Sequence, residues 1–188
     1  MSVSPDHLTR LYADTDDPWN FRTSAYEQAK FAATRAALAR GSYRHALELG
    51  CGNGALAGHL APLCAAYTGV DAVPRALRAA RQAVPEGRFI EGWLPDDLPD
   101  GDFDLIVLSE ILYFLDPAGL ARLGAQVASR WPQAELIAVT WLGNTGHDLQ
   151  GTRALALFAR ALGAGRGLQP VAREDNYRID RRVPGSAA

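Results

Sequence analysis

Residues 47–54 read LELGCGNG, an apolar run that carries one acidic residue, Glu48, and continues into three glycines within five positions. A short apolar run that ends at a glycine-rich turn is typical of a buried strand leading into a helix. Gly50 can take backbone angles closed to other residues, Gly52 lets a ligand approach the main chain, and Gly54 lets the next helix pack closely. The stretch predicts a strand, a turn and a helix with a ligand site at the turn.

Apolar runs and helix-like stretches alternate on both sides of this turn. Short apolar runs predict strands, and apolar residues spaced three or four apart predict helices. Such alternation favours an α/β fold with a mostly parallel sheet and helices on both faces. The predicted strands are 46–49, 67–70, 88–90, 103–108, 135–141, 168–171 and 177–183, and the predicted helices are 24–40, 55–64, 74–84, 117–130 and 150–162.

Composition argues against several functional classes. The chain has 188 residues, enough to bury a core without metal or disulfide support. Its formal net charge of -2 comes without a polybasic tract, so neither nucleic acid nor a membrane surface is an expected partner. Cys51 and Cys64 match no zinc or redox spacing, and no metal is predicted. Without a signal peptide or an apolar run near the ~20 residues that span a bilayer, we expect a cytoplasmic protein.

An acidic residue ends the second predicted strand. Asp71 follows Gly50 by twenty-one residues, the position from which a carboxylate can accept both hydroxyls of a ribose. Two ligands fit this arrangement: a nicotinamide or flavin dinucleotide, or S-adenosylmethionine. Ala55 could complete the glycine pattern of the dinucleotide proteins. Glu48 favours S-adenosylmethionine, because a carboxylate beside the glycines repels a pyrophosphate and attracts the ammonium of a methionine moiety.

The motifs resemble those of class I S-adenosylmethionine-dependent methyltransferases. The resemblance rests on residues 47–54, on Val-Asp at 70–71 and on FDLIVLSE at 103–110. Two flanking segments, DPWNFRTSAYEQAK at 17–30 and LSEILYFL at 108–115, resemble the NodS-like branch. That branch is named for the N-methyltransferase that acts on the amine of a nodulation-factor oligosaccharide.

The resemblance extends from about residue 12 to residue 181, and it implies more than periodicity can give. It implies a Rossmann-like fold with a seven-stranded sheet of order 3-2-1-4-5-7-6, in which strand 7 is antiparallel. It also implies one methyltransferase domain over residues 1–188, with an N-terminal cap helix region at 1–41 and a core at 42–188.

The same resemblance implies a set of cofactor-binding residues. Glu48, Cys51 and the glycines would hold the methionine end, Asp71 the ribose, and Ala72 the adenine. Many relatives carry an aspartate where this sequence has Trp93, so the adenine contact is expected to become a stack or a backbone hydrogen bond through Leu94. The full predicted set is Trp19, Arg22, Tyr26, Glu48, Gly50, Cys51, Gly52, Asp71, Ala72, Trp93, Leu94 and Ser109.

Three residues are candidates for catalysis: Glu110, Tyr113 and His147. Methyl transfer depends mainly on holding nucleophile and methyl in contact. An amine acceptor arrives as an ammonium, which Glu110 could bind and then deprotonate, directly or through water. The alternative is that Glu110 only stabilises the start of the following helix. His147, next to Asp148, is either a base or substrate clamp or a solvated loop histidine.

The sequence thus predicts an S-adenosylmethionine-dependent methyltransferase that acts on an amine of a small-molecule or sugar-like acceptor. Three alternatives stay open: a small-molecule O-methyltransferase, a dinucleotide-dependent oxidoreductase, and a cofactor-binding module without catalysis. The acceptor and the oligomeric state do not follow from the sequence.

Overall fold

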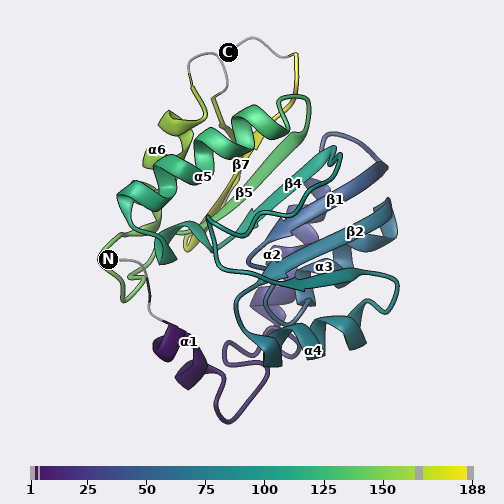
Figure 1. Ribbon diagram of the computed structural model, residues 1–188, viewed down its shortest axis with the longest axis vertical. Helices are drawn as coiled ribbons and strands as arrows, with labels where there is room; N and C mark the ends of the chain where they lie inside the picture. Colours follow the sequence, from purple (N-terminus) through teal and green to yellow (C-terminus); the bar gives the residue numbers. More distant parts are fainter. Residues whose placement is uncertain (1–2, 4, 164–166, 186–188) are drawn as a thin grey trace.

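A seven-stranded sheet forms the centre of the molecule (Figure 1). The computed structural model describes residues 3, 5–163 and 167–185. The strand order is β3-β2-β1-β4-β5-β7-β6, with β1 to β5 parallel and β7 antiparallel to both β5 and β6. The predicted fold class and strand order are therefore confirmed. The strands are β1 (Tyr43–Leu49), β2 (Cys64–Asp71), β3 (Arg88–Glu91), β4 (Leu105–Ser109), β5 (Glu135–Trp141), β6 (Gln169–Arg173) and β7 (Tyr177–Arg182).

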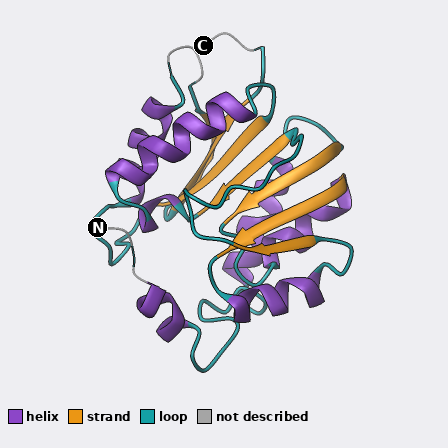
Figure 2. Ribbon diagram, in the orientation of Figure 1, coloured by secondary structure: helices purple, strands orange, loops and turns teal. Residues whose placement is uncertain are grey.

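Helices cover both faces of this sheet, as Figure 2 shows. Successive residues of β4 point to opposite faces: Leu105 and Val107 pack with α2, α3 and α4, whereas Ile106 and Leu108 pack with α5 and α6. Strands buried on both faces explain why the sequence reads as continuous apolar runs. The α-helices are α1 (Pro5–Leu11), α2 (Ala25–Ala36), α3 (Ala55–Leu60), α4 (Pro74–Ala83), α5 (Pro117–Arg130) and α6 (Gly151–Ala161), and two short 3-10 helices are η1 (Ala61–Leu63) and η2 (Leu112–Phe114).

Two predicted helices end earlier than their periodicity suggested. Helix α2 begins after the N-cap Ser24, as expected, but it ends at Ala36 rather than at residue 40. The helix does not continue to residue 40, because the Ala39 N–H donates to Glu135 Oε1 at 2.8 Å. The chain turns toward β1 at this point. The predicted helix 55–64 likewise ends at Leu60, and a 3-10 turn containing Pro62 follows, since proline lacks the N–H that a longer helix requires.

One helix, α1, was not predicted. It lies beyond the carboxyl ends of the strands, apart from the layers that cover the sheet (Figure 1). The Val3 N–H donates to the Phe114 carbonyl at 3.0 Å, and Tyr12, just after α1, is buried against Val73 and Ala76. The N-terminal segment therefore packs over the edge of the sheet where a ligand site was expected.

Candidate functional site

A cavity of about 580 Å³ lies at the carboxyl ends of the central strands, beneath the N-terminal segment. Its volume is in the range of small-molecule sites, and its position is the one at which doubly wound sheets bind ligands. Thirteen of the predicted site residues line it: Trp19, Glu48, Gly50, Cys51, Gly52, Asp71, Ala72, Trp93, Leu94, Ser109, Glu110, Tyr113 and His147.

The glycine turn after β1 has a left-handed backbone at Gly50, Gly52 and Gly54. A Cβ on Gly54 would stand 2.8 Å from the Cα of Ala80, so this glycine permits α3 to pack on α4. On Gly52 the same atom would meet only the Tyr12 hydroxyl, at 3.5 Å. Gly52 therefore presents open backbone to the cavity, whereas Gly54 serves the packing of the fold.

Asp71 organises this turn from the end of β2. Its Oδ2 accepts a hydrogen bond from the Gly52 N–H at 2.8 Å, and its Oδ1 accepts one from the Val73 N–H at 2.9 Å. Burial raises the pKa of the Asp71 carboxyl, although the backbone donors act against this. The carboxylate thus supports the glycine turn as well as facing the cavity, a double role that spacing alone did not reveal.

Glu48 lies at the end of β1 and is almost fully buried, with 2% of its surface exposed. Its Oε2 accepts a hydrogen bond from the Tyr67 hydroxyl at 2.8 Å. Burial raises the pKa of Glu48 to about 8, because the charged carboxylate loses its hydration and gains only one donor. A positively charged group that enters the cavity near Glu48 would favour the ionised form of this carboxyl.

The N-terminal segment is held over the glycine turn by Asp17, which sequence reasoning missed. Asp17 Oδ1 accepts hydrogen bonds from the Phe21 N–H at 2.8 Å and from Asn53 Nδ2 at 2.9 Å. Trp19 lies between Tyr12 and Phe21, with ring centroids 5.6 and 5.5 Å away. Tyr12, Trp19 and Phe21 therefore form an aromatic wall that closes the cavity above the glycines. The one sequence signal for its anchor was the acidic residue Asp17, two positions before Trp19.

Two residues of the predicted cofactor set do not line the cavity. Arg22 forms an ion pair with Asp16 at 2.5 Å, which keeps its guanidinium at the surface. Tyr26 packs edge-on against Trp141 and Tyr177, with ring centroids 6.4 and 6.1 Å away. Both lie on the expected segments, but a partner in the protein holds each side chain outside the site.

The wall after β3 carries Trp93 and Leu94. The Trp93 N–H donates to Asp97 Oδ2 at 2.8 Å, so this amide is not available to a ligand. Gly92 also lines the cavity, and a Cβ there would meet Asp97 and Val70 at 3.0 to 3.1 Å. This wall therefore presents a tryptophan and close-packed backbone to the cavity.

Glu110 lies after β4 and has an unexpected partner, Lys30 of α2. The Lys30 Nζ is 2.7 Å from Glu110 Oε1 and 2.8 Å from Glu27 Oε2. Burial raises the pKa of Glu110, and the charge of Lys30 acts in the opposite direction. Glu110 has a left-handed backbone with a φ of 54°, fixed by its N–H, which donates to the Val139 carbonyl at 2.9 Å. The sequence predicted that Glu110 binds the ammonium of an acceptor. In the structure its carboxylate already forms an ion pair with the ammonium of Lys30.

Tyr113 and His147 stack against each other at the wall of the cavity. The His147 ring centroid is 5.8 Å from that of Tyr113 and 4.6 Å from that of Phe114, and His7 of α1 lies at 6.1 Å. Burial lowers the pKa of His147, and the charge of His7 adds to this effect, so its imidazole is largely neutral at neutral pH. The half-buried histidine therefore packs into a ring cluster with Tyr113 and Phe114.

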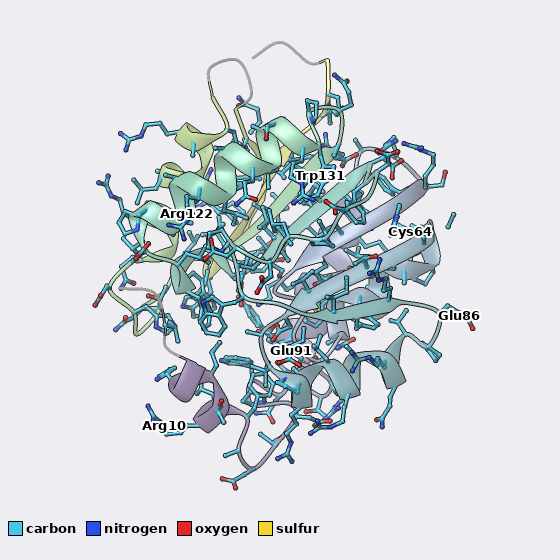
Figure 3. The ribbon with its side chains drawn as sticks, in the orientation of Figure 1. Arg10, Cys64, Glu86, Glu91, Arg122 and Trp131 are labelled. Carbon is cyan, nitrogen blue, oxygen red and sulfur yellow. The ribbon has the colours of Figure 1, made fainter. Side chains whose placement is uncertain are left out.

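The described residues include no group of histidine, cysteine, aspartate and glutamate side chains that could hold a metal ion. Cys51 and Cys64 are free, and Figure 3 shows Cys64 at the start of β2, at the edge opposite the cavity. Among the described helices, none is long and apolar enough to cross a membrane.

The family model described as Nodulation protein S (NodS) matches residues 4–127. The chain belongs to the NodS family. A Nodulation protein S of Sinorhizobium fredii (strain NBRC 101917 / NGR234) is 36% identical over 125 residues, which are 64% of this chain and 57% of that protein. The chain spans about half the length of the curated NodS relatives it matches.

Solved structures show the same fold. The fold matches that of N-methyltransferase NodS from Bradyrhizobium japonicum WM9 in complex with S-adenosyl-L-homocysteine, with a TM-score of 0.80, 22% identity, and 97% and 99% of the two chains covered. A Pseudomonas syringae protein proposed to be a methyltransferase is 33% identical, with a TM-score of 0.70 and 85% and 99% of the chains covered. The fold of this NodS-family chain is therefore the Rossmann-like fold of methyltransferases.

Proposed function

We propose that this chain is an S-adenosylmethionine-dependent methyltransferase. One observation carries the proposal: a single cavity brings together the buried carboxyl of Glu48, the open backbone of Gly52 and the carboxylate of Asp71. These groups match an ammonium, a close-fitting main-chain contact and a ribose. The NodS relatives and the methyltransferase structures support the same activity and the same cofactor. We assign residues 1–41 to a cap and 42–188 to a core within one methyltransferase domain.

The residues present fit that cofactor. Glu48 would bind the ammonium of its methionine moiety, Asp71 its ribose hydroxyls, and the wall at Trp93 and Leu94 its adenine. The aromatic wall at Trp19 would exclude water from the reacting centre. S-adenosylmethionine supplies a methyl group whose carbon is already activated by a sulfonium.

The acceptor that we propose is an amine of a small-molecule or sugar-like compound. Glu110 would hold the acceptor nitrogen, and the proton that this nitrogen must lose would pass to the Glu110 carboxylate or to water. The pair with Lys30 leaves Glu110 Oε2 for this contact, because only Oε1 accepts the lysine. The ring cluster of Tyr113, Phe114 and His147 would hold the body of the acceptor.

Two other activities fit less well. A hydroxyl acceptor carries no cation for the Glu110 carboxylate to hold, so in O-methylation Glu110 could act on the acceptor only by taking up its proton. A dinucleotide-dependent oxidoreductase would bring a pyrophosphate to the glycine turn, and its negative charge would oppose the ionisation of the Glu48 and Asp71 carboxyls there. The carboxylates around the cavity therefore favour a cationic ligand and a cationic acceptor.

Calorimetry of the whole chain with S-adenosylhomocysteine and with NAD separates the two cofactor classes. We expect micromolar binding of the homocysteine compound and none of NAD. A matched variant, Gly52→Val, places a side chain where the methionine moiety would lie, and it should abolish binding while the protein stays folded by circular dichroism. Absence of S-adenosylhomocysteine binding up to millimolar concentration would refute the proposed function.

A panel of amine and hydroxyl acceptors, assayed by transfer of labelled methyl, addresses the acceptor. Methylation of amines only, with loss of turnover but not of S-adenosylhomocysteine affinity in Glu110→Gln, is the expected pattern. Methylation of hydroxyl acceptors alone would overturn the N-methyltransferase assignment.

A further inference from the structure

Three charged side chains meet on one wall of the cavity, and we call them the ion triad: Glu27, Lys30 and Glu110. Lys30 is the sole lysine of the sequence, and 1% of its side chain is exposed. Its Nζ lies within 2.8 Å of a carboxylate oxygen of each glutamate, and these side chains are only 14% and 19% exposed. The triad is therefore a buried ionic group that contains two carboxylates and one ammonium.

Two carboxylates and one ammonium give the triad a formal net charge of one negative unit. The charges that act on Glu110 are those of Lys30 and Glu27, the two other members. Two carboxylates this close repel each other, and the ammonium between them offsets that repulsion. Lys30 thus reduces the charge of the group by one.

The triad borders the end of the cavity proposed for the methionine moiety. Glu110 immediately precedes Ile111, whose side chain lies 2.6 Å from the place of a Cβ on Gly50. All three triad members line the same cavity as Glu48 and the glycines. Because the triad side chains are largely buried, salt screens their charge only weakly toward a ligand in that cavity.

We propose that the ion triad selects the methyl-bearing form of the cofactor over the demethylated product, with Lys30 as a positioning residue that sets the charge of the group. This inference rests on the proposed function. S-adenosylmethionine carries a sulfonium cation, whereas S-adenosylhomocysteine has a neutral thioether at the same atom. A fixed negative charge near that atom stabilises the first and leaves the second unaffected, so the product leaves more readily than the substrate cofactor.

Calorimetry of both compounds at pH 8, without acceptor, tests this selection in four proteins. The measured quantity is the ratio of the two dissociation constants, product over substrate cofactor. Glu110→Gln brings the net charge of the triad to zero, and the ratio should fall by about threefold to tenfold. The double variant Lys30→Met with Glu110→Gln keeps only Glu27, which restores one negative charge, and the ratio should return toward that of the unmodified protein.

The control variant, Glu86→Gln, removes one negative charge from the surface on the far side of the molecule from α1 (Figure 3). Its ratio should not change. If Lys30 acted only through its ion pair with Glu110, the double variant, which lacks both partners, would not recover the ratio. Recovery therefore distinguishes an effect of charge from a structural role of Lys30.

Equal ratios in all four proteins, with both compounds bound, would refute the selection and leave the proposed function intact. Absence of binding of either compound in the unmodified chain would refute the proposed function itself. If the double variant is unfolded by circular dichroism, Glu27→Gln gives an independent test, since it also neutralises the triad and should lower the ratio as Glu110→Gln does. An unchanged ratio in Glu27→Gln would overturn the inference.

Discussion

Replacement of Glu48 by glutamine should change how the stability of the protein depends on pH. In the folded chain Glu48 is buried with one donor, Tyr67, and its pKa is about 8, against a usual value of 4.5. A group whose folded pKa is raised adds stability below the unfolded pKa, and that stability is lost as the pH rises through the folded pKa. Glu48 therefore costs the folded state progressively more between pH 4.5 and pH 8.

The size of this effect follows from the two pKa values. One pKa unit corresponds to about 1.4 kcal/mol, so the full shift corresponds to roughly 5 kcal/mol of the free energy of unfolding. Glu48→Gln keeps the shape of the side chain and an oxygen for the Tyr67 hydroxyl, but it cannot ionise. The variant should resemble the unmodified protein at pH 5 and be more stable by several kcal/mol at pH 8.

Urea unfolding at pH 5, 6.5 and 8 measures this difference directly. The free energy of unfolding of the unmodified protein should fall with rising pH relative to that of Glu48→Gln. Parallel pH curves for the two proteins would refute the reasoning, because they would show that Glu48 titrates alike in the folded and unfolded chain.

The proposed cofactor adds a second measurement on the same residue. An ammonium bound at Glu48 would favour its charged form, so binding near pH 7 should release a proton from the carboxyl. Calorimetry of S-adenosylhomocysteine in buffers of different ionisation enthalpy counts that proton, and Glu48→Gln should abolish the release. Buffer-independent heats in the unmodified protein would place the ammonium elsewhere.

Four further substitutions separate the fold from the site. Asp71→Ala removes two hydrogen bonds of the glycine turn as well as the ribose contact, so both S-adenosylhomocysteine affinity and stability should fall, the latter by about 2 kcal/mol in urea unfolding; unchanged affinity would place the ribose elsewhere. Gly54→Ala should lower the melting temperature far more than Gly52→Ala, since only its Cβ meets backbone; equal losses would contradict this division. Asn53→Ala should speed proteolysis of the N-terminal segment by releasing Asp17, and unchanged cleavage would exclude that anchor.

The first and last residues of elements with strong local signals could be predicted from the sequence. Helix α5 spans Pro117–Arg130 and β5 spans Glu135–Trp141, as the sequence indicated. In α5 the proline stands at the first turn, and the Asp116 side chain caps the helix by accepting the Gly119 N–H at 2.8 Å. Both boundary signals are local, so they could be read without the rest of the chain.

Boundaries set by distant residues were not predictable in this way. Helix α2 ends early because Glu135, almost one hundred residues away, accepts the Ala39 N–H, and no local pattern announces that contact. Helix α1 has seven residues, too few for a clear period, and its place depends on contacts with residues such as Phe114 and Val73. The strand order came from the resemblance to a family, because periodicity does not say which strands are neighbours.

The candidate site shows the same division between local and distant information. Motif spacing placed Glu48, Asp71 and Glu110 at the ends of three strands, and all three line one cavity. Spacing could not show that Lys30 would meet Glu110, since eighty residues separate the two in the chain. This contact changes the chemistry that Glu110 can perform. Burial raises the pKa of Glu110, but the charge of Lys30 acts in the opposite direction, so the carboxylate takes up a proton less readily than a buried carboxylate alone. Glu110 therefore fits the binding and orientation of an acceptor ammonium better than its deprotonation, and water is the better route for the proton.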